Sequence, residues 1–116
     1  MLLESDTERI ASELSHALAE SDEYKAYRTA LAQLKKYPEL YATVNEFRKR
    51  NFAAQNANMD RITHDVYNSF AAEARKLRED PLINEFLDAE LSLGRLIQRV
   101  RKIIVSGIDF ECDFLK

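Results

Sequence analysis

The sequence predicts an all-α protein, an elongated antiparallel bundle of about five helices with a long C-terminal helix. Glycine and proline occur only twice each in 116 residues, whereas a β-sandwich or barrel needs a turn residue about every 8–12 positions. Apolar residues recur at intervals of three and four, which is the period of an amphipathic helix. The composition, 46% apolar and 32% charged, is typical of a globular chain.

Length and charge set the expected domain organisation. We expect one helical domain over residues 1–108 and a C-terminal tail over residues 109–116, where apolar and polar positions alternate. The net charge of −3 gives no global electrostatic case for nucleic-acid binding. No run approaches about 18 uninterrupted apolar residues, and the first residues lack the basic and apolar regions of a signal peptide. The sequence therefore predicts a cytoplasmic protein without membrane contact.

Two helices are expected in the first third of the chain. Ser5 and Glu8 have the spacing of a capping box, so the first helix is placed over residues 6–19. Its apolar stripe consists of Ile10, Leu14 and Leu18. Ser21 is the expected N-cap of the second helix. That helix ends near residues 35–36, where two lysines suit the negative end of the helix dipole.

The middle of the chain predicts a third and a fourth helix. Pro38 fits the first position of the third helix. No proline or glycine occurs over residues 39–80, so the break is placed at residues 56–58, where two asparagines make the weakest helical point. The fourth helix then carries a clean stripe, formed by Met59, Ile62, Val66, Phe70, Ala74 and Leu77.

The fifth helix is the longest, and it begins at the pair Asp80 and Pro81. Aspartate is a good cap and proline fits the first helical turn; the helix runs to about residue 106, and Gly107 is a natural C′ residue. Its apolar arc reaches on the order of 200°, against about 100° or somewhat more for a helix that covers one core. Its length of roughly 39 Å exceeds the width of a compact domain of this size.

So long and apolar a helix predicts self-association or a stable complex, because exposed apolar patches usually mark contacts. The predicted interface consists of Phe86, Glu90, Leu93, Gly94, Ile97, Val100 and Ile104. The alternative is a longer hairpin with the fourth helix that buries both sides internally. A glycine inside a helix costs about 1 kcal/mol, so we expect another backbone or ring to approach Gly94. Glu90 is expected to accept hydrogen bonds from a neighbouring helix or tyrosine, rather than to act as a catalytic acid.

The chain contains no complete catalytic or metal-binding motif. Glu13 and His16 have the spacing of half a di-iron site, but the second half is missing, because Arg61 precedes His64 at the matching position. Cys112 is the only cysteine and lies between two acids, which work against a reactive thiol. A passive tail thiol is the simplest interpretation. The alternative is one ligand to a metal or cluster shared between subunits.

Three segments occur in a defined order along the chain. They are "SDEYKAY" at residues 21–27, "YPEL" at 37–40 with Phe47 following, and "DPLINEFLDAELSLGRLI" at 80–97. In this order and spacing they resemble the YlbF/YmcA family of small helical bacterial proteins, over about residues 10–108. The family also has a YheA branch to which the chain could belong.

The resemblance implies an all-α protein that oligomerises and has no known catalytic centre. In the family, YlbF and YmcA join a third protein in a cytoplasmic complex that acts on ribonuclease Y and influences competence, sporulation and biofilm formation. The implied function is a regulatory adaptor. Its implied partners are further copies, as a dimer or higher oligomer, and related family proteins. Some members carry iron–sulfur clusters through C-terminal cysteines, but this chain has only Cys112 there, so no cofactor is predicted.

Two alternatives to a non-enzymatic adaptor are kept open. Glu90 and Arg101 fall on the same side of the fifth helix about three turns apart, which would suit a small helical enzyme with a pocket lined by both. Arg95, Arg99 and Lys102 form a basic group that could contact RNA weakly. Aromatic residues are not interleaved with this group, so direct nucleic-acid binding is not expected.

Overall fold

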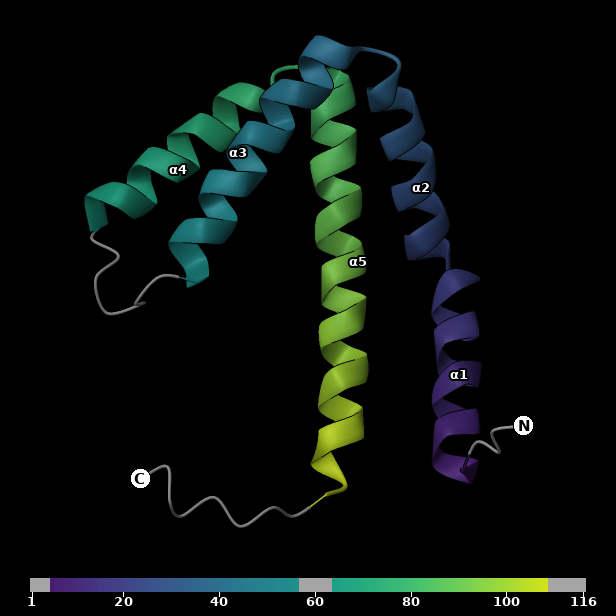
Figure 1. Cartoon of the computed structure of the whole chain (residues 1–116). Helices are drawn as coiled ribbons and strands as arrows, with labels where there is room; N and C mark the ends of the chain where they lie inside the picture. Colours follow the sequence, from purple (N-terminus) through teal and green to yellow (C-terminus); the bar gives the residue numbers. More distant parts are fainter. Residues whose placement is uncertain (1–4, 57–63, 109–116) are drawn as a thin grey trace.

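The computed structural model describes residues 5–56 and 64–108, and within these ranges it contains helices and no strand (Figure 1). The helices are α1 (Asp6–Ala19), α2 (Asp22–Lys35), α3 (Pro38–Asn56), α4 (His64–Leu77) and α5 (Pro81–Ser106). The predicted all-α class with a long C-terminal helix is confirmed. Within the same ranges, no helix combines the length and apolar character that a membrane span requires.

Side-chain caps start three of these helices at the predicted positions. The Ser5 hydroxyl accepts a hydrogen bond from the Glu8 amide at 3.1 Å, which is one half of a capping box, and it donates a hydrogen bond to the Glu8 carboxylate. Ser21 accepts from the Tyr24 amide. The Asp80 carboxylate accepts from the first free amides of α5, with Pro81 following it. Polar side chains thus satisfy amide groups that have no partner within the helix.

Among the later boundaries, only the end of α5 differs from expectation in the described structure. Met59 and Ile62, expected on the fourth helix, lie outside the described residues, and α4 is described from His64. Gly107 does follow α5, but its φ of −87° lies in the right-handed region. The left-handed conformation that favours glycine after a helix is therefore not used here.

The five helices form an elongated, splayed arrangement (Figure 1). α2 packs antiparallel against the first half of α5, which is the most extensive helix–helix contact in the described structure. α1 continues beyond α2 along the direction of the second half of α5. α3 and α4 form a hairpin that diverges at an angle from the N-terminal end of α5, on the side away from α2. The radius of gyration, 18.2 Å, exceeds the roughly 13 Å of a compact chain of this length.

The core is small and lies where α2, α3 and the start of α5 converge. Phe86 of α5 is wholly buried there, and its ring centroid lies 5.6 Å from that of Tyr27 on α2. The other members are Ala30, Leu34, Val44, Ile83 and Leu87. α1 and α4 contribute no buried residue. The whole chain exposes 9610 Å², whereas a compact monomer of 13.4 kDa exposes about 6,500 Å².

An aromatic pair and an ion pair join α3 to α4 among the described residues. Phe47 and Phe70 meet edge to face with ring centroids 6.0 Å apart. Arg50 of α3 donates to both carboxylate oxygens of Glu73 on α4. These hydrogen bonds lower the pKa of the Glu73 carboxyl. Partial burial raises this pKa and the positive charge of Arg50 lowers it, but both effects are smaller than that of the hydrogen bonds. The same hydrogen bonds raise the pKa of the Arg50 guanidinium.

The small core makes stability sensitive to Phe86. Replacing this wholly buried ring, Phe86→Ala, is expected to lower the free energy of unfolding by about 3–5 kcal/mol. Ile103→Ala is the control, because that side chain is 72% exposed and its loss is expected to cost at most about 0.5 kcal/mol. Urea unfolding followed by circular dichroism measures both. Equal destabilisation by the two variants would contradict the placement of the core.

The ion pair of the hairpin predicts a pH dependence. Because the folded carboxylate of Glu73 binds a proton less tightly than the unfolded one, the pair stabilises the hairpin at neutral pH. This contribution is lost as the pH falls through the lowered pKa, below the unfolded value of about 4.3. Arg50→Gln should return the pKa of Glu73 towards its ordinary value. A carbon-13 NMR titration of the Glu73 carboxyl checks this, and identical titrations in both proteins would refute it.

Candidate functional site

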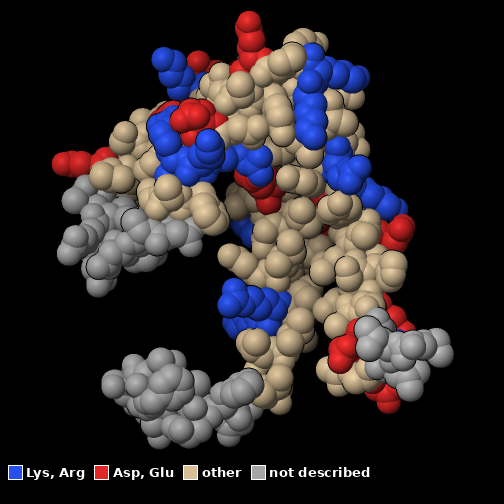
Figure 2. All heavy atoms as spheres, in the orientation of Figure 1, with Lys and Arg blue, Asp and Glu red and all other residues tan. Residues whose placement is uncertain are grey.

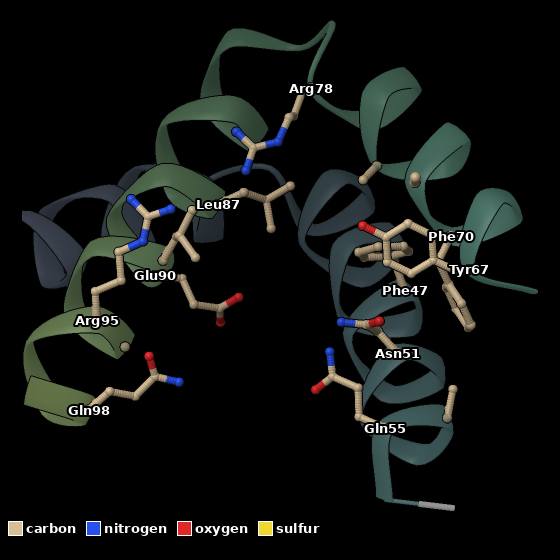
Figure 3. Close-up of a pocket in the computed structure, with 15 residues that line it drawn as sticks. Phe47, Asn51, Gln55, Tyr67, Phe70, Arg78, Leu87, Glu90, Arg95 and Gln98 are labelled. Carbon is tan, nitrogen blue, oxygen red and sulfur yellow. The ribbon is translucent and has the colours of Figure 1, made fainter. Parts of the chain in front are cut away.

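An open cleft lies between α5 and the α3–α4 hairpin, and it is visible as the hollow beneath the hairpin in Figure 2. Its volume is about 650 Å³. Leu87, Leu91 and Gly94 of α5 line one wall, and Phe47 of α3 with Phe70 of α4 line the other. Figure 3 shows these walls facing each other across the opening. The cleft exists because the α3–α4 hairpin lies close to α5 only near the N-terminal end of α5 (Figure 1).

The polar groups of the cleft are amides and arginines. Asn51 and Gln55 come from α3, and Gln98 and Arg95 from α5 (Figure 3). Arg78, at the end nearest the α4–α5 turn, is already engaged, because its guanidinium lies 2.6 Å from the Asp88 carboxylate and 2.9 Å from the Asn84 amide oxygen. The cleft is thus an apolar-walled surface with a polar rim, which is the anatomy of a protein interface.

Glu90 joins α5 to α3. Its carboxylate lies 2.6 Å from the guanidinium of Arg48, and both side chains are about one-third exposed. The same guanidinium lies 5.1 Å from the centroid of the Phe86 ring and donates a hydrogen bond to Asn45 at 3.0 Å. The prediction that Glu90 makes a polar packing contact with a neighbouring helix is confirmed. The sequence alone did not single out Arg48 as the partner.

The alternative of an enzyme pocket lined by both Glu90 and Arg101 is not found in the described structure. Glu90 lines two clefts, but Arg101 lines neither of them and is exposed. Glu90 is instead paired with Arg48, which is the arrangement of a structural ion pair. Among the described residues, no group of three or more His, Cys, Asp and Glu side chains could hold a metal ion. Cys112 lies outside the described residues.

The five residues with large apolar side chains in the predicted interface separate into three groups by burial. Phe86 belongs to the core of its own chain, because the α2–α5 contact buries it completely, so it is unavailable to a partner. Leu93 and Val100 are partly buried. Ile97 and Ile104 remain about half exposed. A contact of these exposed positions with a second molecule stays a prediction.

Gly94 lies open on the cleft side of α5. We expected another backbone or ring to approach it closely. No heavy atom of a neighbouring part of the chain lies within 4 Å of a Cβ built at this position. The expected approach is therefore not made by the described residues of this chain.

Further exposed apolar side chains broaden the apolar arc of α5. They are Leu91 near the middle of the helix, Ile103 and Val105 in its second half, and Ile108 just after its end. The helical period indicated this breadth. The sequence did not predict the opposite wall of the cleft, which contains Tyr67 and Phe70. That wall depends on the angle between helices, and the sequence of a single helix contains no local signal of this angle.

The fold and this surface define a class of protein: an elongated helical protein with an exposed apolar helix, an open cleft and a carboxylate already neutralised by arginine. The comparisons with known proteins narrow the class. A family described as "Control of competence regulator ComK, YlbF/YmcA" matches residues 8–109. The chain belongs to this YlbF/YmcA family, as the three motifs indicated. The description of the family is that of a regulatory one.

Relatives from several bacteria match over most of the chain. A UPF0342 protein of Staphylococcus saprophyticus is 32% identical over 101 residues, which is 85% of this chain and 89% of the relative. One of Staphylococcus epidermidis is 31% identical with the same coverage. One of Caldicellulosiruptor bescii is 32% identical over 105 residues, 88% of this chain and 87% of the relative. No solved structure matches the chain.

The Arg48–Glu90 pair predicts a measurable coupling between α3 and α5. A double-mutant cycle with Arg48→Met and Glu90→Gln is expected to give a coupling energy of about 0.5–1 kcal/mol, because the pair is only partly exposed. The control cycle uses Arg9 and Glu13 on α1, which lie 2.9 Å apart but are largely exposed. Their coupling should be about 0.3–0.5 kcal/mol or less. Denaturant unfolding measures both, and no coupling at Glu90 would contradict a structural role.

Proposed function

We propose that this protein is a non-enzymatic regulatory adaptor that acts by binding other protein chains through α5 and the cleft beside it. The observation that carries the proposal is the unburied apolar surface on the second half of α5. Ile97 is 47% exposed and Ile104 is 51% exposed, although both belong to the apolar arc of the helix. Apolar positions so arranged stabilise a fold poorly and stabilise a complex well.

The partners proposed are further copies of the chain and related proteins of the YlbF/YmcA family. Membership of a family described by the control of a competence regulator supports a regulatory role. Within that role, the finer proposal is a complex that modulates ribonuclease Y-dependent RNA processing and, through it, competence, sporulation and biofilm formation. The adaptor would act in the cytoplasm, where that complex works.

The chemistry of the cleft supports binding rather than catalysis. Glu90 is held by Arg48, and Arg78 is held by Asp88, so two of the three charged groups that line the cleft are already paired. A catalytic acid or base needs a pKa matched to its task and a reacting group within reach. Paired side chains on an open, apolar-walled surface suit shape recognition of a helix better.

The proposal predicts that a charge on α5 abolishes partner binding. Tagged wild-type chain, expressed in its native host, is expected to capture YlbF/YmcA-family proteins or ribonuclease Y from lysate. Ile97→Asp should reduce this capture at least tenfold, because a buried unpaired carboxylate is strongly unfavourable in an apolar interface. Affinity capture with quantitative mass spectrometry is the measurement.

Ser92→Asp is the matched control, because Ser92 is exposed on the polar side of the same helix. It should capture as the wild type does. Circular dichroism verifies that both variants keep their helix content. Unchanged capture by Ile97→Asp, or equal loss with Ser92→Asp, would remove the support for this surface.

A further inference from the structure

One stripe of α5 begins in the cleft and continues beyond it. Positions three and four residues apart lie on the same side of a helix. The stripe on the cleft side consists of Leu87, Leu91, Gly94, Gln98, Arg101, Val105 and Ile108. From Leu91 onwards each of its members is exposed. The described residues thus leave this side of α5 open over residues 91–108, a length of roughly 25 Å at 1.5 Å per residue.

Basic side chains accompany the exposed stripe. Arg101 belongs to it, and Arg95 lines the cleft beside it. Lys102 follows Arg95 by about two helical turns, so the two lie on the same flank. Within the part of the chain that the structure describes, none of these three forms an ion pair, whereas Arg99 is paired with Glu23. Figure 2 shows basic side chains at the edge of α5 beside the hollow. This side of α5 therefore fits an occupant that is both apolar and acidic.

Residues 109–116 have that complementary chemistry. They lie outside the described residues, and their sequence, DFECDFLK, follows directly on the end of the stripe. Acidic and apolar residues alternate in it: Asp109, Phe110, Glu111, Cys112, Asp113 and Phe114. The segment contains three acidic residues and one basic, whereas residues 91–108 contain four basic residues and no acidic one. Opposite charges of this kind favour and orient a contact between the two segments.

The length of the segment matches the distance to the cleft. Gln98 is the cleft residue nearest the end of α5, and it lies roughly 15 Å before Ile108. If two residues reverse the chain direction, the remaining six reach about 20 Å at about 3.3 Å per residue in an extended conformation. Asp113 then comes to the level of Arg101, and Phe114 to the level of Gln98. The end of the segment thus reaches the mouth of the cleft.

The cleft has room for an aromatic side chain at that point. No heavy atom of the described chain lies within 4 Å of a Cβ built at Gly94. On the opposite wall, Tyr67 is 66% exposed and Phe70 lines the cleft. Aromatic rings pack favourably against each other in edge-to-face or offset geometry. Phe114 in this position would supply the ring that a glycine inside α5 led us to expect.

We infer that the cleft is the docking site of this chain's own residues 109–116. The segment folds back along the exposed stripe of α5, with Phe114 in the cleft and with Glu111 and Asp113 beside Arg101 and Lys102. Its short connection to α5 gives an effective concentration on the order of millimolar, which favours docking within one chain over docking into a second copy. The docked segment limits the access of partners to the cleft, and this consequence alone rests on the proposed function.

A spin label at the end of the segment tests its position. Lys116→Cys is combined with Cys112→Ser, so that the full-length chain carries a nitroxide on a single thiol. The side-chain amide NMR signals of Asn51 and Gln55, which line the cleft on α3, should lose most of their intensity relative to the reduced label, because docking brings the nitroxide close to them. Asn68 is exposed on the same hairpin outside the cleft, and its signal should lose much less. Equal attenuation of all three, or attenuation of none, would overturn the inference.

A mixed sample distinguishes docking within one chain from docking between copies. An isotope-labelled chain with Cys112→Ser, which has no thiol, is mixed with spin-labelled chain of natural isotopic composition. Only a label on a second molecule can then attenuate the observed cleft signals. Unchanged signals support docking within the chain. Attenuation as strong as in the doubly labelled chain would assign the cleft to the segment of a second copy and overturn the inference.

Charge reversal tests the pairing between the segment and α5. In the spin-labelled chain, Arg101→Glu with Lys102→Glu should abolish the attenuation of the cleft signals, because like charges then face each other. Glu111→Lys with Asp113→Lys should abolish it for the same reason. The four substitutions together should restore it. Attenuation that persists in either double variant, or that is not restored in the combination, would overturn the pairing.

An equivalent basic pair elsewhere on the surface provides the matched control. Arg75 and Lys76 are also adjacent and exposed, but they lie on α4 outside the cleft. Arg75→Glu with Lys76→Glu should leave the attenuation as it is in the spin-labelled chain. Circular dichroism verifies that all variants keep their helix content. Loss of attenuation in this control would show a non-specific effect of net charge and overturn the inference.

Partner capture separates this inference from the proposed function. Glu111→Lys with Asp113→Lys should raise the capture of partners about twofold or more, because a cleft occupied half of the time weakens the apparent affinity by about that factor. Unchanged capture would overturn the limit on access. If attenuation is absent while Ile97→Asp still reduces capture, docking of the segment fails and the proposed function stands. If no variant captures a partner but the cleft signals are attenuated, the proposed function fails and docking stands.

Discussion

The structure depends on a mismatch between the length of α5 and the length of the helices that cover it. α5 has 26 residues, whereas α2, its main partner, has 14. The contact between them buries Phe86 and its neighbours and forms the only sizeable core in the described structure. Beyond that contact, the apolar arc of α5 continues without an equivalent cover. The exposed isoleucines, the open cleft and the large surface area all follow from this one difference.

The direction in which the α3–α4 hairpin leaves α5 creates the open cleft beside that helix. Arg48 of α3 binds Glu90 and stacks over Phe86, while Arg78 binds Asp88. Both ion pairs act near the first half of α5, so they anchor the base of the hairpin and leave its far end apart from the helix (Figure 1). An apolar surface between two rigid walls results. Glu90 and Arg78, two of the charged groups that line it, are paired within the chain.

This arrangement is suited to a protein whose function is to be bound. Under the proposed function, a partner bound to α5 and the cleft would stabilise the fold, because anything that binds only the folded state stabilises it. The amount of folded protein would then depend on the presence of its partners. Further copies of the chain and related chains would compete for the same surface.

The sequence by itself determined the local elements. Capping residues at Ser5, Ser21 and Asp80 set where three helices begin, and apolar spacing set the breadth of the α5 arc, because both depend on neighbours within one or two turns. The motif order also identified the family. Only the tertiary structure decided that Phe86 is core rather than interface, that Glu90 pairs with Arg48, and that Gly94 lies open. These depend on the angle at which α3 and α4 leave α5, an angle set by contacts between residues distant in the chain, which the period of any single helix does not encode.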